Sequence, residues 1–269
     1  MGCFEVVTFD TPFAGRFGVF TCFDILFHDP TVRLLEKVHK MIFPTAWMNL
    51  LPLLTAIQIQ RAVSLGANVT LLAANLRHDS KAMTGSGIFT PSTSIYHHAF
   101  HHPGGPEEGK LLGDSEPLSA SLPTRSPNPS PSPSHFISSM MCDPFSFVLL
   151  HGSEGQLTVC DGPLCWAFAG NHTAEGHFAM QVCALVRCSG SEVSSCGKEV
   201  EEAESRVDFR LEGKFGTRYV YPSLLGSGMV VDKPDRIEKT TDGRVTMEHS
   251  GMSVGLVTAC LYGRVYDQD

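Results

Sequence analysis

The sequence has no long uninterrupted hydrophobic run. A helix that crosses a bilayer needs roughly 18–20 consecutive apolar residues. The longest candidate, around WMNLLPLLTAI, is interrupted by Asn49 and Pro52. The pattern therefore predicts a soluble chain with no membrane span.

Positive charge is also scarce. The sequence has 20 Lys and Arg against 28 Asp and Glu, a formal net charge of −8 at pH 7, with both signs mixed along the chain. Nucleic-acid binding depends on a basic surface that neutralises phosphates, so the sequence argues against a nucleic-acid partner.

The opening segment MGCFEVVTF has neither the basic nor the apolar region of a secretory signal peptide. It also fails the myristoylation pattern, which requires Ser or Thr where this chain has Val6. Because the chain opens directly on a strand-like segment, we expect the natural protein to begin upstream of Met1.

Core-forming material is ample, at 42% hydrophobic and 9% aromatic in 269 residues. Strand-like and helix-like patterns alternate in residues 1–112, which predicts an α/β layer. One helix is expected over 29–40, with Asp29 as its cap, and another over 51–66, with Gly66 ending it.

The remainder of the chain changes character twice. Residues 113–138 are rich in Ser and Pro and cannot bury enough apolar surface to order themselves, which predicts a linker. Residues 139–269 contain short strand-like segments separated by Gly, Asp and Pro, which predict a separate all-β domain, most simply a sandwich.

Cysteines are concentrated in the predicted β domain. This density favours disulfides and an oxidising compartment. Four zinc ligands are the alternative, but their spacing in strand-like segments favours disulfides, whose connectivity cannot be predicted from the sequence. Five of the nine cysteines fall within one short stretch of this domain: Cys160, Cys165, Cys183, Cys188 and Cys196.

Two glycosylation sequons occur, at Asn68 and Asn171. Asn68 opens a segment expected to be a core strand, so Asn171 is the predicted acceptor. The histidine-rich stretch YHHAFHH suggests a metal site, but Pro103 and two glycines follow it and no carboxylate is fixed beside it. We therefore predict neither a metal nor a cofactor.

Cys22 lies in the apolar run RFGVFTCFDILFHDP. A buried free cysteine usually acts as a small hydrophobic residue, so core packing is one interpretation. The other is a nucleophile, because Cys22 sits where a strand passes into a turn that could aim backbone N–H groups at a thiolate.

Longer motifs favour the second interpretation. TFDTPFAGRFGVFTCFDILFHDP, FPTAWMN, LLAAN and MTGSGIFTP, together with GKFGTRYVYP and SVGLVTACLYGRVYDQD, closely resemble the biotinidase and vanin (pantetheinase) branch of the nitrilase superfamily. The resemblance covers nearly everything except the linker. It implies an α/β nitrilase-type αββα sandwich, incomplete here, followed by a β domain.

The resemblance also implies a Glu-Lys-Cys triad for amide hydrolysis, in which Cys22 matches the nucleophile. Thr45 and Trp47, in FPTAWMN, are then expected to line the substrate cleft, although Trp47 alone could equally be a packing residue. The family's Glu and Lys lie upstream of the nucleophile and have no match here, since Glu36 and Lys37 follow it on an expected solvated helix face.

Three hypotheses follow. The first is a secreted biotinidase-type hydrolase that releases biotin from biotinyl-lysine and related small-molecule amides through a thioester at Cys22. The second is a pantetheinase that releases pantothenate and cysteamine. The third is a catalytically inactive secreted remnant, because two of the three triad residues are missing from this chain.

Overall fold

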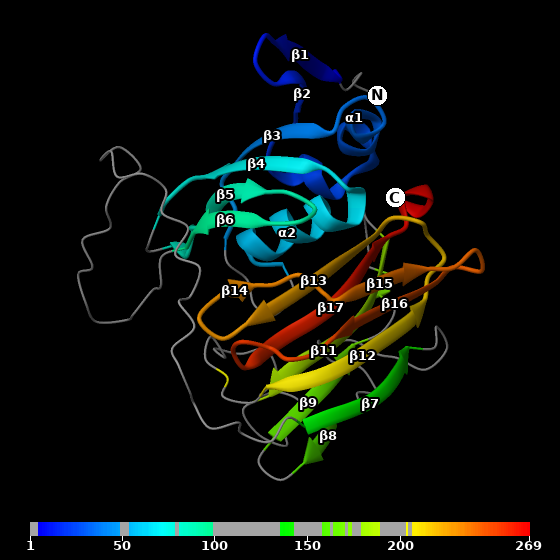
Figure 1. Cartoon of the computed structure of the whole chain (residues 1–269). Coiled ribbons are helices and arrows are strands. Elements are labelled where there is room, and N and C mark those ends of the chain that lie inside the picture. The colour runs from blue at the N-terminus through cyan, green and yellow to red at the C-terminus, as the bar shows by residue number, and fades with distance from the viewer. Residues whose placement is uncertain are drawn as a thin grey trace.

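The computed structural model in Figure 1 describes residues 5–48, 54–78, 81–98, 135–142, 158–161, 164–169, 172–173, 179–188, 203 and 206–269. Within these ranges the strands form sheets of six, seven and four strands. The predicted fold class, an α/β layer followed by an all-β part, is confirmed. None of the helices in the described ranges has the length and apolar character needed to cross a membrane.

The six-stranded sheet follows the order of the sequence. Its middle strands β2, β3 and β4 are parallel, while β1 pairs antiparallel to β2, β5 to β4, and β6 to β5. The strands are β1 (Val7–Thr11), β2 (Gly15–Val19), β3 (Lys40–Thr45), β4 (Thr70–Asn75), β5 (Ser86–Phe89) and β6 (Ser94–His97).

Helix α2 (Ala56–Ala67) connects β3 to β4 and begins at a capping box. The Thr55 hydroxyl accepts a hydrogen bond from the Gln58 backbone N–H, and the Gln58 side-chain oxygen accepts one from the Thr55 N–H at 3.0 Å. The helix ends at Asn68, whose backbone is left-handed with φ 57° and ψ 48°. Both termini of α2 are therefore fixed by local hydrogen bonding.

The helix expected over 29–40 is much shorter. It consists of one π turn, η2 (His28–Val32), and one α turn, α1 (Arg33–Leu35). Asp29 keeps the extended backbone of a cap, and its carboxylate lies 3.4 Å from Arg33. The helix cannot continue to residue 40, because Lys40 already opens β3 in parallel pairing with β4.

Two sheets form the β part as a sandwich. The seven-stranded sheet has the order β14-β13-β17-β11-β9-β8 with β10 beside β11, and the four-stranded sheet has the order β15-β16-β12-β7. Apolar residues such as Leu211, Met247 and Leu261 fill the space between them. The strands are β7 (His135–Cys142), β8 (Thr158–Asp161), β9 (Leu164–Ala169), β10 (His172–Thr173), β11 (Ala179–Cys188), β12 (Val207–Lys214), β13 (Val220–Gly226), β14 (Val230–Val231), β15 (Arg236–Lys239), β16 (Arg244–His249) and β17 (Leu256–Arg264).

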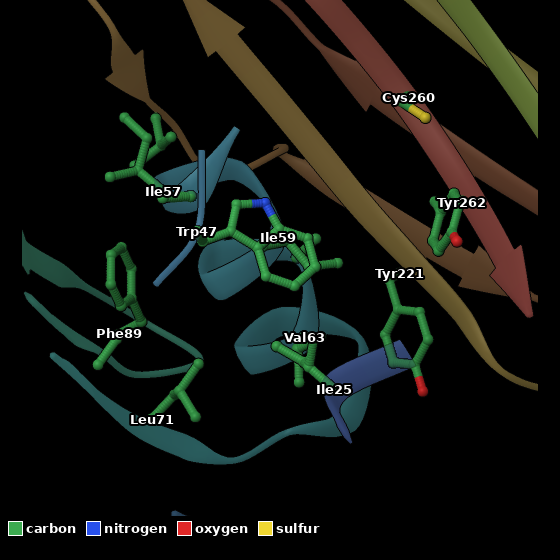
Figure 2. Close-up of a cluster of buried hydrophobic side chains, with 14 of the residues drawn as sticks. Ile25, Trp47, Ile57, Ile59, Val63, Leu71, Phe89, Tyr221, Cys260 and Tyr262 are labelled. Atoms are coloured by element: carbon green, nitrogen blue, oxygen red, sulfur yellow. The ribbon is translucent and has the colours of Figure 1, made fainter. Parts of the chain in front are cut away.

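Helix α2 lies between the six-stranded and the seven-stranded sheets (Figure 1). Figure 2 shows the cluster that results, in which Ile59 and Val63 of α2 lie between Leu71 of β4 and Tyr221 of β13. Because this cluster draws residues from both parts of the chain, the described structure has a continuous core across them.

The end predicted for α2 at Gly66 is wrong, because the helix continues to Ala67 and Asn68 takes the left-handed cap position. Gly66 has a different reason to be glycine. A Cβ at this position would lie 2.7 Å from Tyr221 Cδ1 and 2.9 Å from the Val220 backbone oxygen. The glycine permits close contact between α2 and β13.

The proposed domain boundaries remain predictions. Strand β7 begins at His135, so it includes the last residues of the segment predicted as a linker, while 113–134 lies outside the described residues.

Cys183 and Cys188 each take part in a disulfide bond, which the sequence favoured over zinc ligation. Asn171, the predicted glycosylation site, also lies outside the described residues.

Candidate active site

The candidate site lies at one edge of the six-stranded sheet. Strands β2, β3 and β4 are parallel, so their carboxyl ends meet at the same edge, where α/β folds commonly build binding sites. Cys22 follows β2, Thr45 and Trp47 come at the end of β3, and Asn75 ends β4. The structure therefore brings the three predicted site residues to one edge and adds Asn75.

Cys22 is the first residue of a short 3-10 helix, η1 (Cys22–Leu26), which two residues separate from the end of β2. Its φ is +52°, a left-handed conformation that non-glycine residues rarely adopt. The turn is held by a hydrogen bond of 2.8 Å from the Thr21 backbone N–H to the Asp24 carboxylate. Strained backbone of this kind is typical of functional residues held in place by their surroundings.

Cys22 forms no disulfide bond in the part of the chain that the structure describes, and the residue is half-buried, so it is not sealed in the core. The other cysteine that the structure describes as free, Cys260 on β17, is fully buried, and this burial raises the pKa of its thiol to about 12. Cys260 is therefore a packing residue. Cys22 has the exposure and the backbone setting that a nucleophile requires.

Trp47 is fixed on the site edge by Asn75. The Trp47 backbone N–H donates to Asn75 Oδ1 at 2.8 Å, and Asn75 Nδ2 donates back to the Trp47 carbonyl at 3.0 Å. The indole N–H donates to the Leu54 carbonyl at 2.9 Å, so the ring orientation is set as well. Asn75 thereby ties the end of β4 to the segment after β3.

Thr45 is buried, and its hydroxyl has no hydrogen-bond partner among the described residues. A buried hydroxyl without a partner is uncommon in a folded protein and costs free energy. The hydroxyl lies near the edge of the candidate site but is itself shielded from solvent. A role of Thr45 in substrate binding stays a prediction.

Apolar side chains surround the site edge. Phe23, next to Cys22, is 61% exposed, and its ring lies 5.5 Å from that of Trp47. Met48 and Leu76, which follow β3 and β4, are also exposed. Exposed apolar groups gathered at the ends of neighbouring strands are typical of a binding surface for an apolar ligand.

Other candidates do not join this edge. Glu36 and Lys37 are exposed beyond α1, as expected for a solvated face, and do not form part of the site. A cavity of about 170 Å³ lies elsewhere, between α2 and β13, lined in part by Glu36, Gly66 and Tyr219. Among the histidines of YHHAFHH, burial lowers the pKa of His98 to about 4.

Sequence reasoning missed two contributors to the site, Asn75 and Phe23. Asn75 had a signal, because it is a polar residue that directly ends the buried strand segment TLLAA. Phe23 had none that could be separated from the surrounding apolar run. Only the ring contact with Trp47 reveals its position.

Comparison with known proteins gives this arrangement a family context. Residues 165–269 match the family described as the Vanin C-terminal domain. Biotinidase from Takifugu rubripes is 52% identical over 98% of this chain and 61% of its own length. Over nearly its whole length the chain is therefore similar to proteins of the biotinidase/vanin family.

Further biotinidases and pantetheinases are similar over the same extent. Biotinidase from Homo sapiens is 40% identical over 98% of this chain and 58% of its own length. Pantetheinase from Sus scrofa is 40% identical over 98% of this chain and 56% of its own length. The chain thus spans about three fifths of the length of the curated relatives it matches.

Proposed function

We propose that this chain carries the nucleophile of an amide hydrolase of the biotinidase type, which releases biotin from biotinyl-lysine and related amides. The observation that carries the proposal is the left-handed turn of Cys22 at the carboxyl edge of the parallel strands, beside Trp47 and Thr45. The similarity to biotinidase supports the substrate class.

The proposed chemistry proceeds in two steps. The Cys22 thiolate attacks the amide carbonyl, the C–N bond breaks, and the amine leaves with a proton, so that the acyl group remains on sulfur as a thioester. Water then attacks the thioester, which releases the carboxylic acid and restores the thiol. Division of a difficult hydrolysis into two easier steps is the usual advantage of a covalent intermediate.

The family resemblance assigns no residue of this chain as the general base or as the cation that stabilises the oxyanion. In the nitrilase superfamily, which the motifs resemble, a Glu and a Lys fill these roles. We place both groups in sequence outside these 269 residues. The chain alone is then expected to present the nucleophile and part of the binding surface without turning over substrate.

Pantetheinase is the second candidate. It is supported by the matched Vanin C-terminal domain and by pantetheinases of 40% identity over 98% of the chain. Biotin amides and pantetheine share an amide joined to an apolar or flexible acyl chain, and the apolar rim of Phe23, Met48 and Leu76 suits either. Substrate release assays must distinguish them.

Secretion is part of the same proposal. The disulfides of Cys183 and Cys188 support it, because disulfides persist in oxidising compartments and are rare in the cytosol. Release of the protein into the medium of secreting cells, with both cysteines oxidised, is the expected result.

The experiment joins this chain to the portion of Takifugu rubripes biotinidase that it does not match. We expect the chimera to release biotin from biotinyl-lysine. We also expect peptide mass spectrometry to locate an acyl group on Cys22 that hydroxylamine removes. Cys22→Ser and Cys22→Ala should abolish both signals. Glu36→Gln, at a residue that lines the separate cavity of about 170 Å³, is the control and should leave both signals unchanged.

Each other outcome has a defined meaning. Release of pantothenate from pantetheine without biotin release would transfer the proposal to the second candidate. If the chimera unfolds cooperatively, and is therefore folded, yet hydrolyses neither substrate, the catalytic proposal is wrong and a non-enzymatic role takes its place.

A further inference from the structure

The turn after α2 contains a sequon that the sequence pattern alone had assigned to a buried strand. Asn68 is instead exposed at the end of the helix, and strand β4 begins only at Thr70. The turn is held through Ser64, whose carbonyl accepts the Asn68 and Val69 backbone N–H groups and whose hydroxyl donates to the Val69 carbonyl at 2.7 Å.

We propose that Asn68 is an acceptor for an N-linked oligosaccharide. The sequon Asn68-Val69-Thr70 supplies the recognition pattern, and the exposed side chain on a rigid turn leaves room for a glycan in the folded state. The proposal does not depend on hydrolase activity. It depends only on entry of the chain into the secretory pathway.

Translation of the chain in the presence of microsomes, with a secretion signal added at its N-terminus, tests this proposal. In the Asn171→Gln background, which removes the other sequon, we expect one glycosidase-sensitive mass increment. Asn68→Gln and Thr70→Ala should remove it, and Thr70→Ser should retain it. An Asn171→Gln chain that enters the microsomes without any increment would overturn the proposal.

A second inference comes from the opposite end of the chain. Arg264, at the end of β17, has a side chain that is only 1% exposed, and its Nε–H donates to the Leu26 carbonyl at 2.7 Å. Leu26 is the last residue of η1, the short helix that Cys22 opens. Arg264, in the β part, thus forms a hydrogen bond with the turn that carries the candidate nucleophile.

The guanidinium is itself held on several sides. It donates to the Ala179 carbonyl and, at 2.6 Å, to the Asp269 carboxylate, which also accepts the Ala179 backbone N–H at 2.9 Å. Its Cζ lies 4.9 Å from the centroid of the Tyr266 ring. Tyr266 in turn contacts His28, just after η1, with ring centroids 5.6 Å apart.

We infer that Arg264 is a positioning residue for Cys22. The inference rests on the proposed function only in giving Cys22 the role of nucleophile. The claim that Arg264 fixes the conformation of the Cys22 turn does not depend on that role. A guanidinium fixed by several buried partners can hold a backbone carbonyl in one place, whereas the left-handed Cys22 conformation would otherwise relax. Arg264 acts through η1 and touches no reacting atom.

The test uses the chain with Arg264→Met/Asp269→Asn, which removes both members of the pair so that no lone charge stays buried. Hydrogen exchange of residues 21–27 should accelerate by about tenfold or more, while exchange in α2 stays unchanged. Alkylation of Cys22 by iodoacetamide, read on its own peptide, should accelerate about fivefold as the half-buried thiol becomes accessible.

Two further variants separate positioning from general destabilisation. Leu261→Ala, in the same strand but in the core between the two β sheets, should lower stability without a local change at 21–27. Arg264→Lys, which keeps the charge but has a single nitrogen in place of the guanidinium fork, should restore part of the protection. Unchanged exchange at 21–27, or an equal acceleration in Leu261→Ala, would overturn the inference.

Neither readout requires hydrolysis. If the chimera proves inactive while the exchange and alkylation results hold, the proposed function fails and the positioning role stands. If the chimera is active, the same pair of substitutions should lower kcat with KM little changed, since the turn orients the nucleophile rather than binding substrate.

Discussion

At Gly66 the absence of a side chain sets how closely α2 approaches β13. An alanine here gains helix propensity, worth about 1 kcal/mol, but its Cβ would lie within 3.0 Å of both the side chain and the backbone of Tyr221. We expect Gly66→Ala to lower the free energy of unfolding by about 1–3 kcal/mol, because overpacking outweighs the propensity gain.

Denaturant unfolding followed by circular dichroism measures this change. Gly216→Ala is the matched control, since its Cβ would meet only Gln181 at 3.5 Å or more, an ordinary contact. It should change stability by no more than about 0.5 kcal/mol. Equal stability of the two variants would mean that α2 and β13 can separate at little cost.

At the scale of elements, the four-stranded sheet has an ion-pair network on one face. Glu212 of β12 accepts from Arg244 of β16 at 2.6 Å and from Arg210 at 3.1 Å. These hydrogen bonds hold the pKa of the Glu212 carboxyl below its ordinary value of 4.5. A lowered folded-state pKa stabilises the sheet above the ordinary value, and this stabilisation is lost as pH falls through the folded-state pKa.

Glu212→Gln should therefore destabilise the protein at pH 7, by about 1–2 kcal/mol. The difference from the unmodified chain should shrink as pH falls below the ordinary value of 4.5. Thermal unfolding at a series of pH values measures it. Glu238→Gln, in an exposed pair with Arg236, should show little effect at any pH, and a pH-independent loss in Glu212→Gln would refute the electrostatic origin.

Elements were predictable where local chemistry alone decides them. The alternation of buried residues in β3 and the preference for disulfides both lie within short windows of sequence. The length of the helix after Asp29 could not be predicted in this way, because it is limited by the pairing of Lys40 in the sheet. Gly66 and Asn68 were misread for the same reason, since their roles depend on contact with β13 and on a cap that glycine usually provides.

The candidate site was predictable in part. Cys22, Thr45 and Trp47 came from family resemblance, and their common edge follows from parallel pairing that sequence patterns only suggest. The left-handed backbone of Cys22, the Asn75 link and the Arg264 contact depend on long-range packing. No window of sequence contains both members of those contacts.

For the whole molecule, the outer face of the six-stranded sheet is a continuous apolar stripe. Each of the six strands contributes one apolar residue to a row of paired positions, and the residues from β1, β5 and β6 are exposed. The stripe consists of Val7, Val19, Ile42, Leu72, Ile88 and Ile95. Such a surface favours association with another apolar surface.

We expect the purified 269-residue chain to self-associate, with apparent mass rising with concentration in light scattering. Ile88→Lys/Ile95→Lys should reduce the association, because charges on the stripe must be desolvated at the contact. Ser92→Lys/Thr93→Lys, at the exposed connection between β5 and β6, adds equal charge outside the stripe and should not. A monomeric, cooperatively unfolding chain at all concentrations would contradict this expectation.

The contact between Arg264 and Leu26 also has a consequence for biosynthesis. The two residues are 238 positions apart in the sequence, so the ribosome completes the cysteine turn long before it makes the arginine that holds it. Throughout most of translation the thiol emerges on an unrestrained segment, open to oxidation or to the wrong disulfide partner. The Cys22 thiol is therefore most vulnerable to oxidation while the chain is being made, before Arg264 can form its contact with Leu26.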